Sequence, residues 1–413
     1  MPCRGQGWCV GLVLLWSCLL GMSYLPRVVE LQLDSRGAQD PVLVLYWTPW
    51  WKGFPLDGYS LTNESCQRPD QFQGLDPSFP WCQFTHNRKQ QLRADLLVFH
   101  YFDVKLNELP QRIRGQPWVL QSQEAPVRYP FGIGFHSKFN FMMSYRFDSH
   151  IPNPYADHQL IDRVLDPIPD AVFNQSLRKL ENLAPVLWVA SNCRSFNGRE
   201  VYIQELMKYI RVDSYGTCLN TRALPNGMSK ADLLCAGYKF YLTFENSNCK
   251  DYVSEKLFQV LRAGILPVVY GPDDYSGFIP DSHSVIYARD FPSPQALAEF
   301  LIQLDQNDDL YRTFFQYKNG GELDPAFLHR WDPEMFRTRY NLCGVCHLAE
   351  KRVETSEMIR RDTSCHPSKS MIRLLNRDEN VSINFSTPVI LLGFSLLLST
   401  LCYLKLRIRF PQS

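Results

Sequence analysis

The feature that most constrains the fold is an alternation of short, mostly apolar runs with stretches of helical periodicity. The apolar runs lie at residues 41–46, 96–99, 117–120, 185–189, 239–244 and 265–270. Runs of this length and composition are typical of strands that are buried on both faces. Helical spacing over residues 199–210 and 253–263 separates the later runs, and Gly264 ends the second of these helices. Strands that alternate with helices predict parallel sheets with helices on both faces.

The length of the chain indicates more than one such sheet. At roughly 100–200 residues per domain, 413 residues allow two to four domains. The globular part is too long for one doubly wound sheet, so we predict one domain over residues 40–170 and another over 171–347. Their seam lies in a proline-containing stretch near residues 165–185. The polar segment that follows, residues 348–387, is predicted to be a stalk.

Uncharged apolar segments lie near both ends of the chain. We interpret residues 1–26 as a cytoplasmic tail with an uncleaved signal anchor, followed by a short stem over 27–39; a cleaved signal peptide is the alternative. Residues 388–404 form a second uncharged run, followed by a basic tail at 405–413. A basic cluster after an apolar run favours a second transmembrane segment with a cytoplasmic end. The alternative for this run is a buried core helix.

Glycosylation and cysteine patterns place the middle of the chain in the secretory pathway. The N-glycosylation sequons begin at Asn63, Asn174, Asn380 and Asn384. All of them lie between the apolar segments, as do nine of the 13 cysteines. Because nine is odd, at least one of these thiols is free or pairs between chains. Cys343 and Cys346 have zinc-ligand spacing, but disulfides to distant cysteines fit an oxidising compartment better.

Composition excludes two broad classes of protein. Hydrophobic residues make up 45% and charged residues 21%, which is not the composition of a mainly disordered chain. Lys and Arg number 43 against 42 Asp and Glu, which gives a net charge of +1. Nucleic-acid binders usually carry a basic excess, so we do not expect a nucleic-acid partner.

The residues with the clearest chemical potential follow the predicted strand at 239–244. Glu245 and Asn246 come directly after it, and Glu255 and Lys256 lie in the first turn of the next helix. In open α/β sheets, ligands bind beyond the carboxyl ends of the strands. A helix N-terminus with a nearby lysine suits a phosphate group. There is no Walker or dinucleotide glycine motif, and the alternative for Lys256 is a solvated surface lysine.

The same region resembles the signature of the α-1,3-fucosyltransferases, glycosyltransferase family 10. The resemblance is carried by Phe244-Glu-Asn-Ser, Asp251-Tyr-Val-Ser-Glu-Lys256, Ala263-Gly-Ile-Leu-Pro-Val-Val269 and Gly271. Other similar blocks contain Cys82-Gln-Phe-Thr85, Glu124-Ala125-Pro126, Met143-Ser-Tyr-Arg146, Ser191-Asn192-Cys193, Arg199 and Val212-Asp-Ser-Tyr-Gly216. The resemblance covers roughly residues 40–347. It implies two Rossmann-like domains that face a cleft, the GT-B type, with GDP-fucose bound by the C-terminal domain.

The resemblance also assigns roles to individual residues. Glu124 matches the family's catalytic base, although Ala125 stands where many relatives carry Ser; the alternative for Glu124 is a surface carboxylate. Arg199 and Lys256 match the cations that bind the diphosphate of the donor, and Glu255 matches the acid that binds its ribose. The remaining expected donor-pocket residues are Ser191, Asn192, Tyr241, Asn246 and Tyr252. Since two cations supply the charge, no essential metal is expected, and a divalent ion is expected at most to stimulate.

The cysteines take on a pattern from the same resemblance. It implies that Cys343 and Cys346 pair with Cys66 and Cys82, in an order that the sequence leaves open. Two local bridges are expected in the donor domain, among Cys193, Cys218, Cys235 and Cys249.

The implied activity is transfer of L-fucose from GDP-fucose in α-1,3 linkage to N-acetylglucosamine. Its acceptor would be a glycoprotein glycan, either an N-glycan core or N-acetyllactosamine, at the Golgi membrane with the catalytic domain in the lumen. Residues 99–103 depart from the His-His-Arg/Trp-Asp segment of relatives that make Lewis-type structures, so the acceptor is not predicted. The alternative is a catalytically inactive relative that acts as a membrane-anchored glycan-binding protein.

Overall fold

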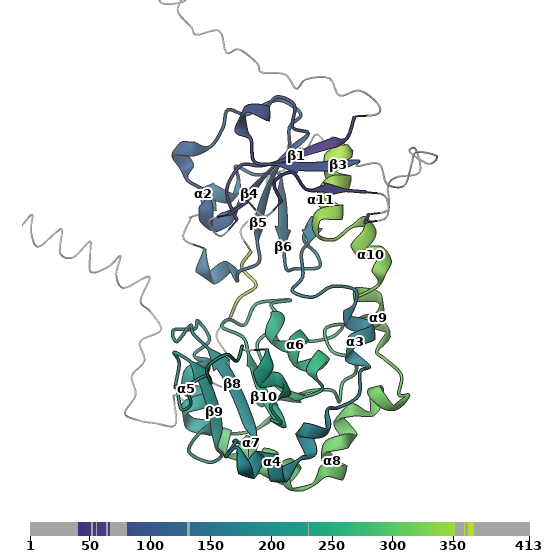
Figure 1. Ribbon diagram of the computed structural model, residues 1–413. Coiled ribbons are helices and arrows are strands. Elements are labelled where there is room, and N and C mark those ends of the chain that lie inside the picture. Colours follow the sequence, from purple (N-terminus) through teal and green to yellow (C-terminus); the bar gives the residue numbers. More distant parts are fainter. Residues whose placement is uncertain are drawn as a thin grey trace, which may run out of the picture. The chain divides into compact units, whose positions relative to one another are not determined.

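Two units, each built around its own parallel sheet, make up the part of the chain that the computed structural model describes (Figure 1). The described residues are 40–50, 53–54, 56–62, 65–66, 81–129, 133–229, 231–351, 359 and 362–366. Within them, unit 1 comprises the residues up to Glu124, Tyr129–Pro154 and Glu334–Arg361. Unit 2 comprises Ala125–Arg128, Tyr155–Pro333 and the chain from Asp362 onward.

The sheet of unit 1 has the strand order β2-β3-β1-β4-β5-β6-β7. Its strands are β1 (Val42–Tyr46), β2 (Ser60–Leu61), β3 (Cys82–Thr85), β4 (Leu96–His100), β5 (Trp118–Ser122), β6 (Phe141–Ser144) and β7 (Ile151–Pro152). All neighbouring strands pair in parallel except β2 with β3. The apolar runs predicted as strands correspond to β1, β4 and β5, which are almost wholly buried because helices and loops cover both faces.

The sheet of unit 2 has the order β12-β11-β10-β8-β9, and all its pairs are parallel. Its strands are β8 (Val186–Ala190), β9 (Val212–Gly216), β10 (Phe240–Phe244), β11 (Leu266–Tyr270) and β12 (Ile286–Tyr287). Read from β9, the sequential order is 2-1-3-4-5, a doubly wound arrangement with a topological switch point between β8 and β10. The prediction of an α/β protein with parallel sheets is therefore confirmed.

Helices connect and cover these strands. The α-helices are α2 (Ile133–His136), α3 (Leu160–Val164), α4 (Gln175–Leu180), α5 (Arg199–Leu206), α6 (Glu255–Ala263), α7 (Pro294–Gln306), α8 (Asp308–Arg312), α9 (Pro325–Arg330), α10 (Pro333–Thr338) and α11 (Asn341–Glu350). Helix α6 ends as predicted, at Gly264, which takes the left-handed conformation with φ of 68°. Helix α7 begins after Ser293, whose side chain accepts the N–H of Ala296, with Pro294 in the first position.

The division into units differs from the predicted domains in two places. Unit 2 takes over at Tyr155 instead of at residue 171, because α3 packs against α6 within unit 2. The proline stretch chosen as a seam is also packed there, since a Cβ on Gly264 would lie 2.9 Å from Cδ of Pro169. Residues 334–347 belong to unit 1, where α11 contacts β1 and β7.

The disulfides follow the predicted pattern only in part. Helix α11 carries Cys343 and Cys346, which bond to Cys66 and Cys82 respectively, all within unit 1. In unit 2, the structure has one of the expected local bridges, between Cys193 and Cys218.

The second expected local bridge in unit 2 is wrong. Cys249 bonds to Cys365, and Cys235 is an exposed free thiol among the described residues. The reason is that residues 362–366, predicted to be part of a polar stalk, lie against the loop that contains Cys249. Ile359, from the same predicted stalk, is buried in the core of unit 1.

Several predictions fall outside the described residues. These are the anchor and stem at 1–26 and 27–39, the apolar run and basic tail at 388–404 and 405–413, and the sequons at Asn63, Asn380 and Asn384. A search of the described helices finds none with the length and apolar character needed to cross a membrane. The sequon residue Asn174 is exposed and caps α4 through its Oδ1, which accepts the N–H of Leu177 at 2.9 Å. The cap does not use Nδ2 of Asn174, the atom to which a glycan would be attached.

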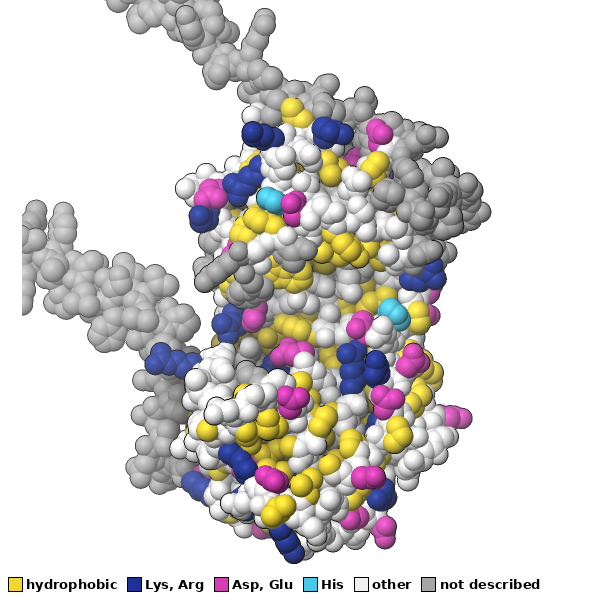
Figure 2. All heavy atoms as spheres, viewed as in Figure 1, with side chains coloured by type: hydrophobic (Ala, Val, Ile, Leu, Met, Phe, Trp, Pro, Cys, Tyr) yellow, Lys and Arg dark blue, Asp and Glu magenta, His cyan; other side chains and the backbone are white. Residues whose placement is uncertain are grey.

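Charged side chains of both signs are interspersed on the visible face of the molecule (Figure 2). This distribution matches the near-zero net charge of the sequence. The visible face therefore shows no single-sign field of the kind that attracts a polyanion.

Candidate functional site

The carboxyl ends of β8 and β10 meet at the switch point of unit 2, where open α/β sheets bind their ligands. The loop that follows each strand is bonded to the other. The N–H of Phe196, in the β8–α5 loop, donates to the carbonyl oxygen of Asn246 at 2.9 Å. Nδ2 of Asn197 donates to the carbonyl oxygen of Glu245 at 3.0 Å and to Oδ1 of Asn248 at 2.7 Å. These bonds hold the two loops together as one structure.

Arg199 is buried at the switch point, with only 2% of its surface exposed. It begins α5 directly after Gly198, which has φ of 67°. Its guanidinium joins the two strand ends, because one terminal nitrogen donates to the carbonyl oxygen of Phe244 at 2.5 Å and the other to that of Asn192 at 3.2 Å. A guanidinium has five N–H donors, so others remain for a ligand. Arg199 therefore supplies both rigidity and a permanent positive charge.

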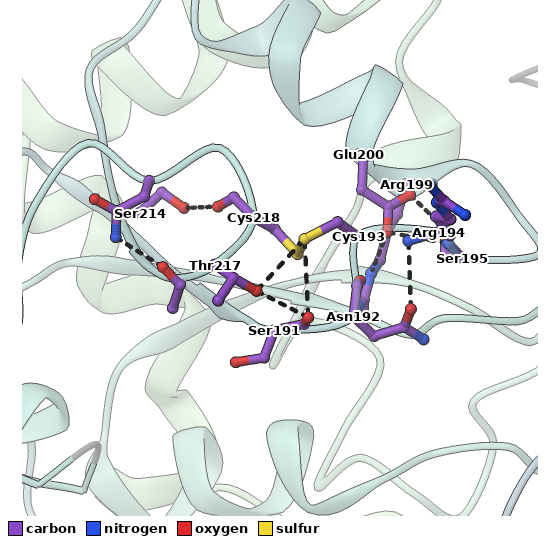
Figure 3. The surroundings of a disulfide bond; sticks show 12 residues. Ser191, Asn192, Cys193, Arg194, Ser195, Arg199, Glu200, Ser214, Thr217 and Cys218 are labelled. Carbon is purple, nitrogen blue, oxygen red and sulfur yellow. Dashed lines mark hydrogen bonds and ion pairs between the residues drawn. A yellow bond between two sulfur atoms is a disulfide. The ribbon is translucent and has the colours of Figure 1, made fainter.

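The start of α5 is further held by the side chain of Ser195 and by a disulfide (Figure 3). The Ser195 hydroxyl accepts the N–H of Arg199 at 3.1 Å and donates to the Glu200 carboxylate at 2.5 Å. The Cys193–Cys218 bond ties this loop to the segment after β9. Nearby, Thr217 donates to the carbonyl oxygen of Ser191 at 2.9 Å.

A buried carboxylate organises the beginning of α6. Glu245 is 1% exposed, and its Oε1 accepts the N–H of Ser254 at 2.7 Å. The Ser254 hydroxyl lies 2.8 Å from both oxygens of that carboxylate, and Nζ of Lys256 donates to the same hydroxyl at 2.8 Å. Lys256 also lies 3.5 Å from Glu245 and 3.2 Å from Glu255. Glu245 is thus the buried negative group at the beginning of α6.

Burial and charge pull the pKa values of this cluster in opposite directions. Burial raises the pKa of Glu245 above its usual range, and the ammonium of Lys256 opposes that rise. Burial alone would lower the pKa of Lys256, but the carboxylates of Glu245 and Glu255 raise it above the ordinary lysine value. Lys256 is therefore a firmly positive group near the carboxyl end of β10.

The other predicted donor residues are distributed unevenly around this cluster. Tyr241 lies in the apolar core beside Leu187 and Val260, and burial raises the pKa of its hydroxyl, with Glu255 adding to the rise. Tyr252 is also buried and contacts the ring of Tyr155. Asn246 is half-buried and accepts a hydrogen bond from Ser247 at 2.8 Å. Asn192 is half-buried and Ser191 is exposed, both in the β8–α5 loop.

Glu124, the predicted base, lies in unit 1 just after β5. It is half-buried, and its N–H donates to the Ser122 hydroxyl at 3.2 Å. The neighbouring strand β4 ends in His100, a buried ring whose Nδ1 lies 2.6 Å from the Asp103 carboxylate. Burial lowers the pKa of His100, while the Asp103 and Glu124 carboxylates oppose this change. Glu124 therefore lies at the carboxyl edge of its sheet, near His100, whose pKa is lowered by burial and raised by the nearby carboxylates.

Some residues of the site were not predicted. Asn197, Asn248, Ser254 and Glu200 all carry contacts described above. Ser254 has a recognisable signal, because a serine before Glu255 occupies the N-cap position of a helix. The sequence gives no comparable signal for Asn197 or Asn248, whose role comes from a contact across 51 positions.

No group of three or more His, Cys, Asp or Glu side chains suited to hold a metal occurs among the described residues. That the activity needs no essential metal stays a prediction from the sequence.

Two sequence models of one family match the chain. The model described as "Glycosyltransferase family 10 (fucosyltransferase) C-term" matches residues 179–363, and "Fucosyltransferase, N-terminal" matches residues 39–156. The C-terminal match contains the switch-point cluster of unit 2, and the N-terminal match contains Glu124.

Curated relatives carry two kinds of name. Glycoprotein 3-alpha-L-fucosyltransferase A of Drosophila melanogaster is 35% identical over 278 residues, which cover 64% of this chain and 50% of the relative. GDP-fucose protein O-fucosyltransferase 3 of Gallus gallus is 32% identical over 66% of this chain and 58% of its own length. The protein of the same name from Xenopus tropicalis is 35% identical over 68% and 59%.

The matched part of this chain thus spans between half and about three fifths of each of these relatives. A crystal structure of an α1,3-fucosyltransferase with GDP-fucose aligns at 15% identity with a TM-score of 0.46, over 81% of this chain and 97% of that chain. On the two family models and the curated relatives, the chain belongs to glycosyltransferase family 10, the fucosyltransferases.

Proposed function

We propose that this protein transfers L-fucose from GDP-fucose, with inversion at the anomeric carbon, in α-1,3 linkage to N-acetylglucosamine of glycoprotein glycans. The observation that supports this most is the pair of fixed cations, Arg199 and Lys256, at the switch point of unit 2 in a chain of the fucosyltransferase family. A diphosphate ligand matches that charge.

The donor half of the proposal follows from the charge that develops as the glycosidic bond breaks. The leaving GDP gains negative charge on its phosphate, and preorganised cations stabilise such charge without moving. Arg199 is buried and fixed by backbone carbonyls, and Lys256 stays protonated because two carboxylates raise its pKa. We assign Glu255 to accept hydrogen bonds from the ribose hydroxyls, and Asn192 and Asn246 to contact the nucleotide.

The acceptor half needs a general base. Inversion requires that the acceptor hydroxyl attack from the face opposite the leaving GDP and lose its proton in the transition state. We assign this role to Glu124, a half-buried residue just after β5 of unit 1. Burial lowers the pKa of the nearby His100, which favours the neutral form of its ring.

Two alternatives concern the acceptor and the activity. Several vertebrate relatives are named GDP-fucose protein O-fucosyltransferase 3, which favours a protein hydroxyl as a second candidate acceptor. The same donor cluster and the same base would serve that reaction. The other alternative is an inactive family member that binds glycans at a membrane, against which stands the presence of Glu124, Arg199, Tyr252, Glu255 and Lys256.

We also propose that the protein works in the lumen of the Golgi, attached to the membrane. The disulfides within both units support an oxidising compartment. The test is whether Asn174 carries an N-glycan, detected by its removal with a glycosidase, after expression in animal cells. A chain that carries no N-glycan and stays protease-sensitive in sealed vesicles would contradict a lumenal location.

The activity is tested by incubating the full chain with GDP-fucose and separate acceptors. These are N-acetyllactosamine, its sialylated form, an N-glycan core and a folded protein domain. We expect transfer to one acceptor class and a loss of roughly 10²–10⁴-fold in kcat for Glu124→Gln. GDP affinity should change little, and Glu322→Gln, at an exposed position, should behave as wild type.

The outcomes separate the alternatives. Transfer to the protein domain alone would replace glycan fucosylation by O-fucosylation. GDP-fucose binding with no transfer to any acceptor would favour the inactive relative. A wild-type chain that binds neither GDP nor GDP-fucose would overturn the donor site.

A further inference from the structure

A short segment near the end of the described chain is fastened across unit 2. We call residues 362–366 the strap. Its Cys365 is disulfide-bonded to Cys249, and the N–H of His366 donates to the carbonyl oxygen of Asn248 at 2.9 Å. Nε2 of His366 lies 3.0 Å from Oδ2 of Asp273. The strap is thus held by a covalent bond, a backbone hydrogen bond and a side-chain contact between His366 and Asp273.

These contacts join two loops at the ligand-binding edge of the sheet. Asn248 and Cys249 belong to the loop after β10, and Asp273 to the loop after β11. β10 and β11 are neighbouring parallel strands, so their loops leave the same edge. The strap therefore connects adjacent loops at the edge where the cation cluster lies.

The loop held by the strap carries the groups assigned to the donor. Cys249 lies between Asn246 and Tyr252 and shortly before α6, whose first turn holds Glu255 and Lys256. Asp251 in the same loop has φ of 60°, a conformation that non-glycine residues adopt at a cost. A loop with such a residue needs outside contacts to keep one shape.

The strap also reaches the other loop of the switch point through a single intermediate. Asn248, which bonds His366 through its backbone, accepts from Nδ2 of Asn197 through its side chain at 2.7 Å. Asn197 precedes Arg199 by two residues and donates to the Glu245 carbonyl oxygen as well. Displacing Asn248 would therefore disturb both loops and both cations.

We propose that the strap is a positioning element of the donor site, which holds the β10–α6 loop in its binding shape before GDP-fucose arrives. This inference rests on the proposed function. A loop that is already ordered loses less conformational entropy when it binds, so the strap should act on donor affinity more than on the chemical step. A merely structural disulfide would lower stability and leave the donor affinity of the folded chain unchanged.

The test compares the full-length wild type with Cys249→Ala/Cys365→Ala and with His366→Ala, which leaves the disulfide in place. We expect about a tenfold rise in the donor KM and in the GDP dissociation constant for the double variant, with kcat within about threefold. His366→Ala should give about a twofold rise, because the contact of His366 with the 76% exposed side chain of Asp273 is weakened by solvent. Cys235→Ala, the same chemical change at an exposed free thiol of unit 2, is the control and should match wild type.

Hydrogen exchange provides a second readout that does not depend on catalysis. Amides over residues 245–256 should exchange faster in the double variant, while those of β8 and β10 keep their protection. If the double variant does not fold, the exchange of this loop in His366→Ala decides the question. Unchanged GDP affinity together with unchanged loop exchange in a folded variant would overturn the proposal.

The two proposals fail in different ways. If wild type binds no GDP, the donor assignment is wrong, and the strap is then judged by loop exchange alone. If wild type binds GDP and the variants bind it equally well, only the role of the strap is wrong.

Discussion

In unit 2, Glu245 places a carboxylate where a diphosphate is proposed to bind. Its carboxylate accepts hydrogen bonds from the N–H and the hydroxyl of Ser254, and Nζ of Lys256 lies 3.5 Å from its Oε2. The side chain is 2% exposed, so its charge is poorly solvated. Glu245 thus offsets the charge of Lys256 and would repel a phosphate bound beside it. A ligand that brings its own negative charge would take over the first of these roles.

Glu245→Gln separates these two effects. The amide keeps the shape of the side chain but removes its charge, so the ammonium of Lys256 loses a buried partner. We expect the free energy of unfolding to fall by roughly 1–3 kcal/mol, less than for a fully isolated charge because Glu255 remains. GDP should then raise the melting temperature of the variant by more than it raises that of wild type, since its phosphate restores the missing charge.

The measurement is thermal unfolding of both proteins with and without GDP, with Glu322→Gln at an exposed position as control. A variant as stable as wild type, or a smaller shift with GDP, would show that Glu245 does not act as the counter-charge of Lys256.

At the scale of elements, the sequence predicts the buried centre of each sheet well. β1, β4, β5, β8, β10 and β11 coincide with the continuous apolar runs. These strands are recognisable because burial on both faces makes them mostly apolar, with polar residues such as His100 and Gln121 near their ends. The start of α6 is also recognisable, because strands and helices alternate along the chain and a helix is expected after the buried strand β10.

Elements that use polar residues internally escape such a pattern. β9 contains Asp213 and Ser214, both buried. The Asp213 carboxylate accepts the N–H of Ala184 at 3.0 Å and the hydroxyl of Tyr238 at 2.8 Å, so it is satisfied by partners that lie 29 and 25 positions away. Polar residues with distant partners look like loop residues in the sequence. The same limit hides Asn197 and Asn248, although the cations and acids beside them are identified.

The close approach of β8 and β9 makes Gly216 indispensable at the end of β9. Its φ is 94°, and a Cβ there would lie 2.3 Å from the carbonyl oxygen of Ala190, at the end of β8. Gly216→Ala should therefore separate the strand ends beside the Cys193–Cys218 bond. We expect a loss of roughly 2–4 kcal/mol in the free energy of unfolding, from the left-handed backbone and the overlap together.

Gly227→Ala is a matched control for this prediction. Gly227 has φ of 82° but nothing within 4 Å of the added Cβ, so it should lose only the backbone part, roughly 1–2 kcal/mol. The two variants are compared by urea unfolding. Equal losses would mean that the backbone conformation, and not the contact between β8 and β9, determines the requirement for glycine at residue 216.

At the scale of the whole molecule, the order of elements along the chain does not give the composition of each unit. α11 follows the last element of unit 2 in the sequence, yet it packs on β1 and β7 of unit 1. Val345, Cys346 and Ala349 are fully buried there. A segment of ten residues with ordinary amphipathic character carries no mark of the unit it joins. The cysteines alone indicated a return to the N-terminal part, and they did so through the family resemblance.

The two disulfides of α11 close loops that overlap along the chain, and this makes their contributions to stability non-additive. Cys66–Cys343 and Cys82–Cys346 each span more than 260 positions, but when one is formed the other closes a ring of only about 20 residues. On chain-entropy grounds, breaking either bond alone should cost roughly 3 kcal/mol. Breaking both should cost roughly a further 5 kcal/mol, because only then is the long loop released.

The cost is measured by hydrogen exchange, as the opening free energy of the amides of β1 and β4 in unit 1. The proteins compared with wild type are the Cys66→Ala/Cys343→Ala variant, the Cys82→Ala/Cys346→Ala variant and their combination. The Cys193–Cys218 bond of unit 2 spans 25 positions and shares no loop with them, so its removal should leave the opening of these amides unchanged. If the combined variant loses only the sum of the two separate losses, each disulfide acts locally on α11. The connection between the first strand and the last helix would then depend on their apolar packing and not on closure of the long loop.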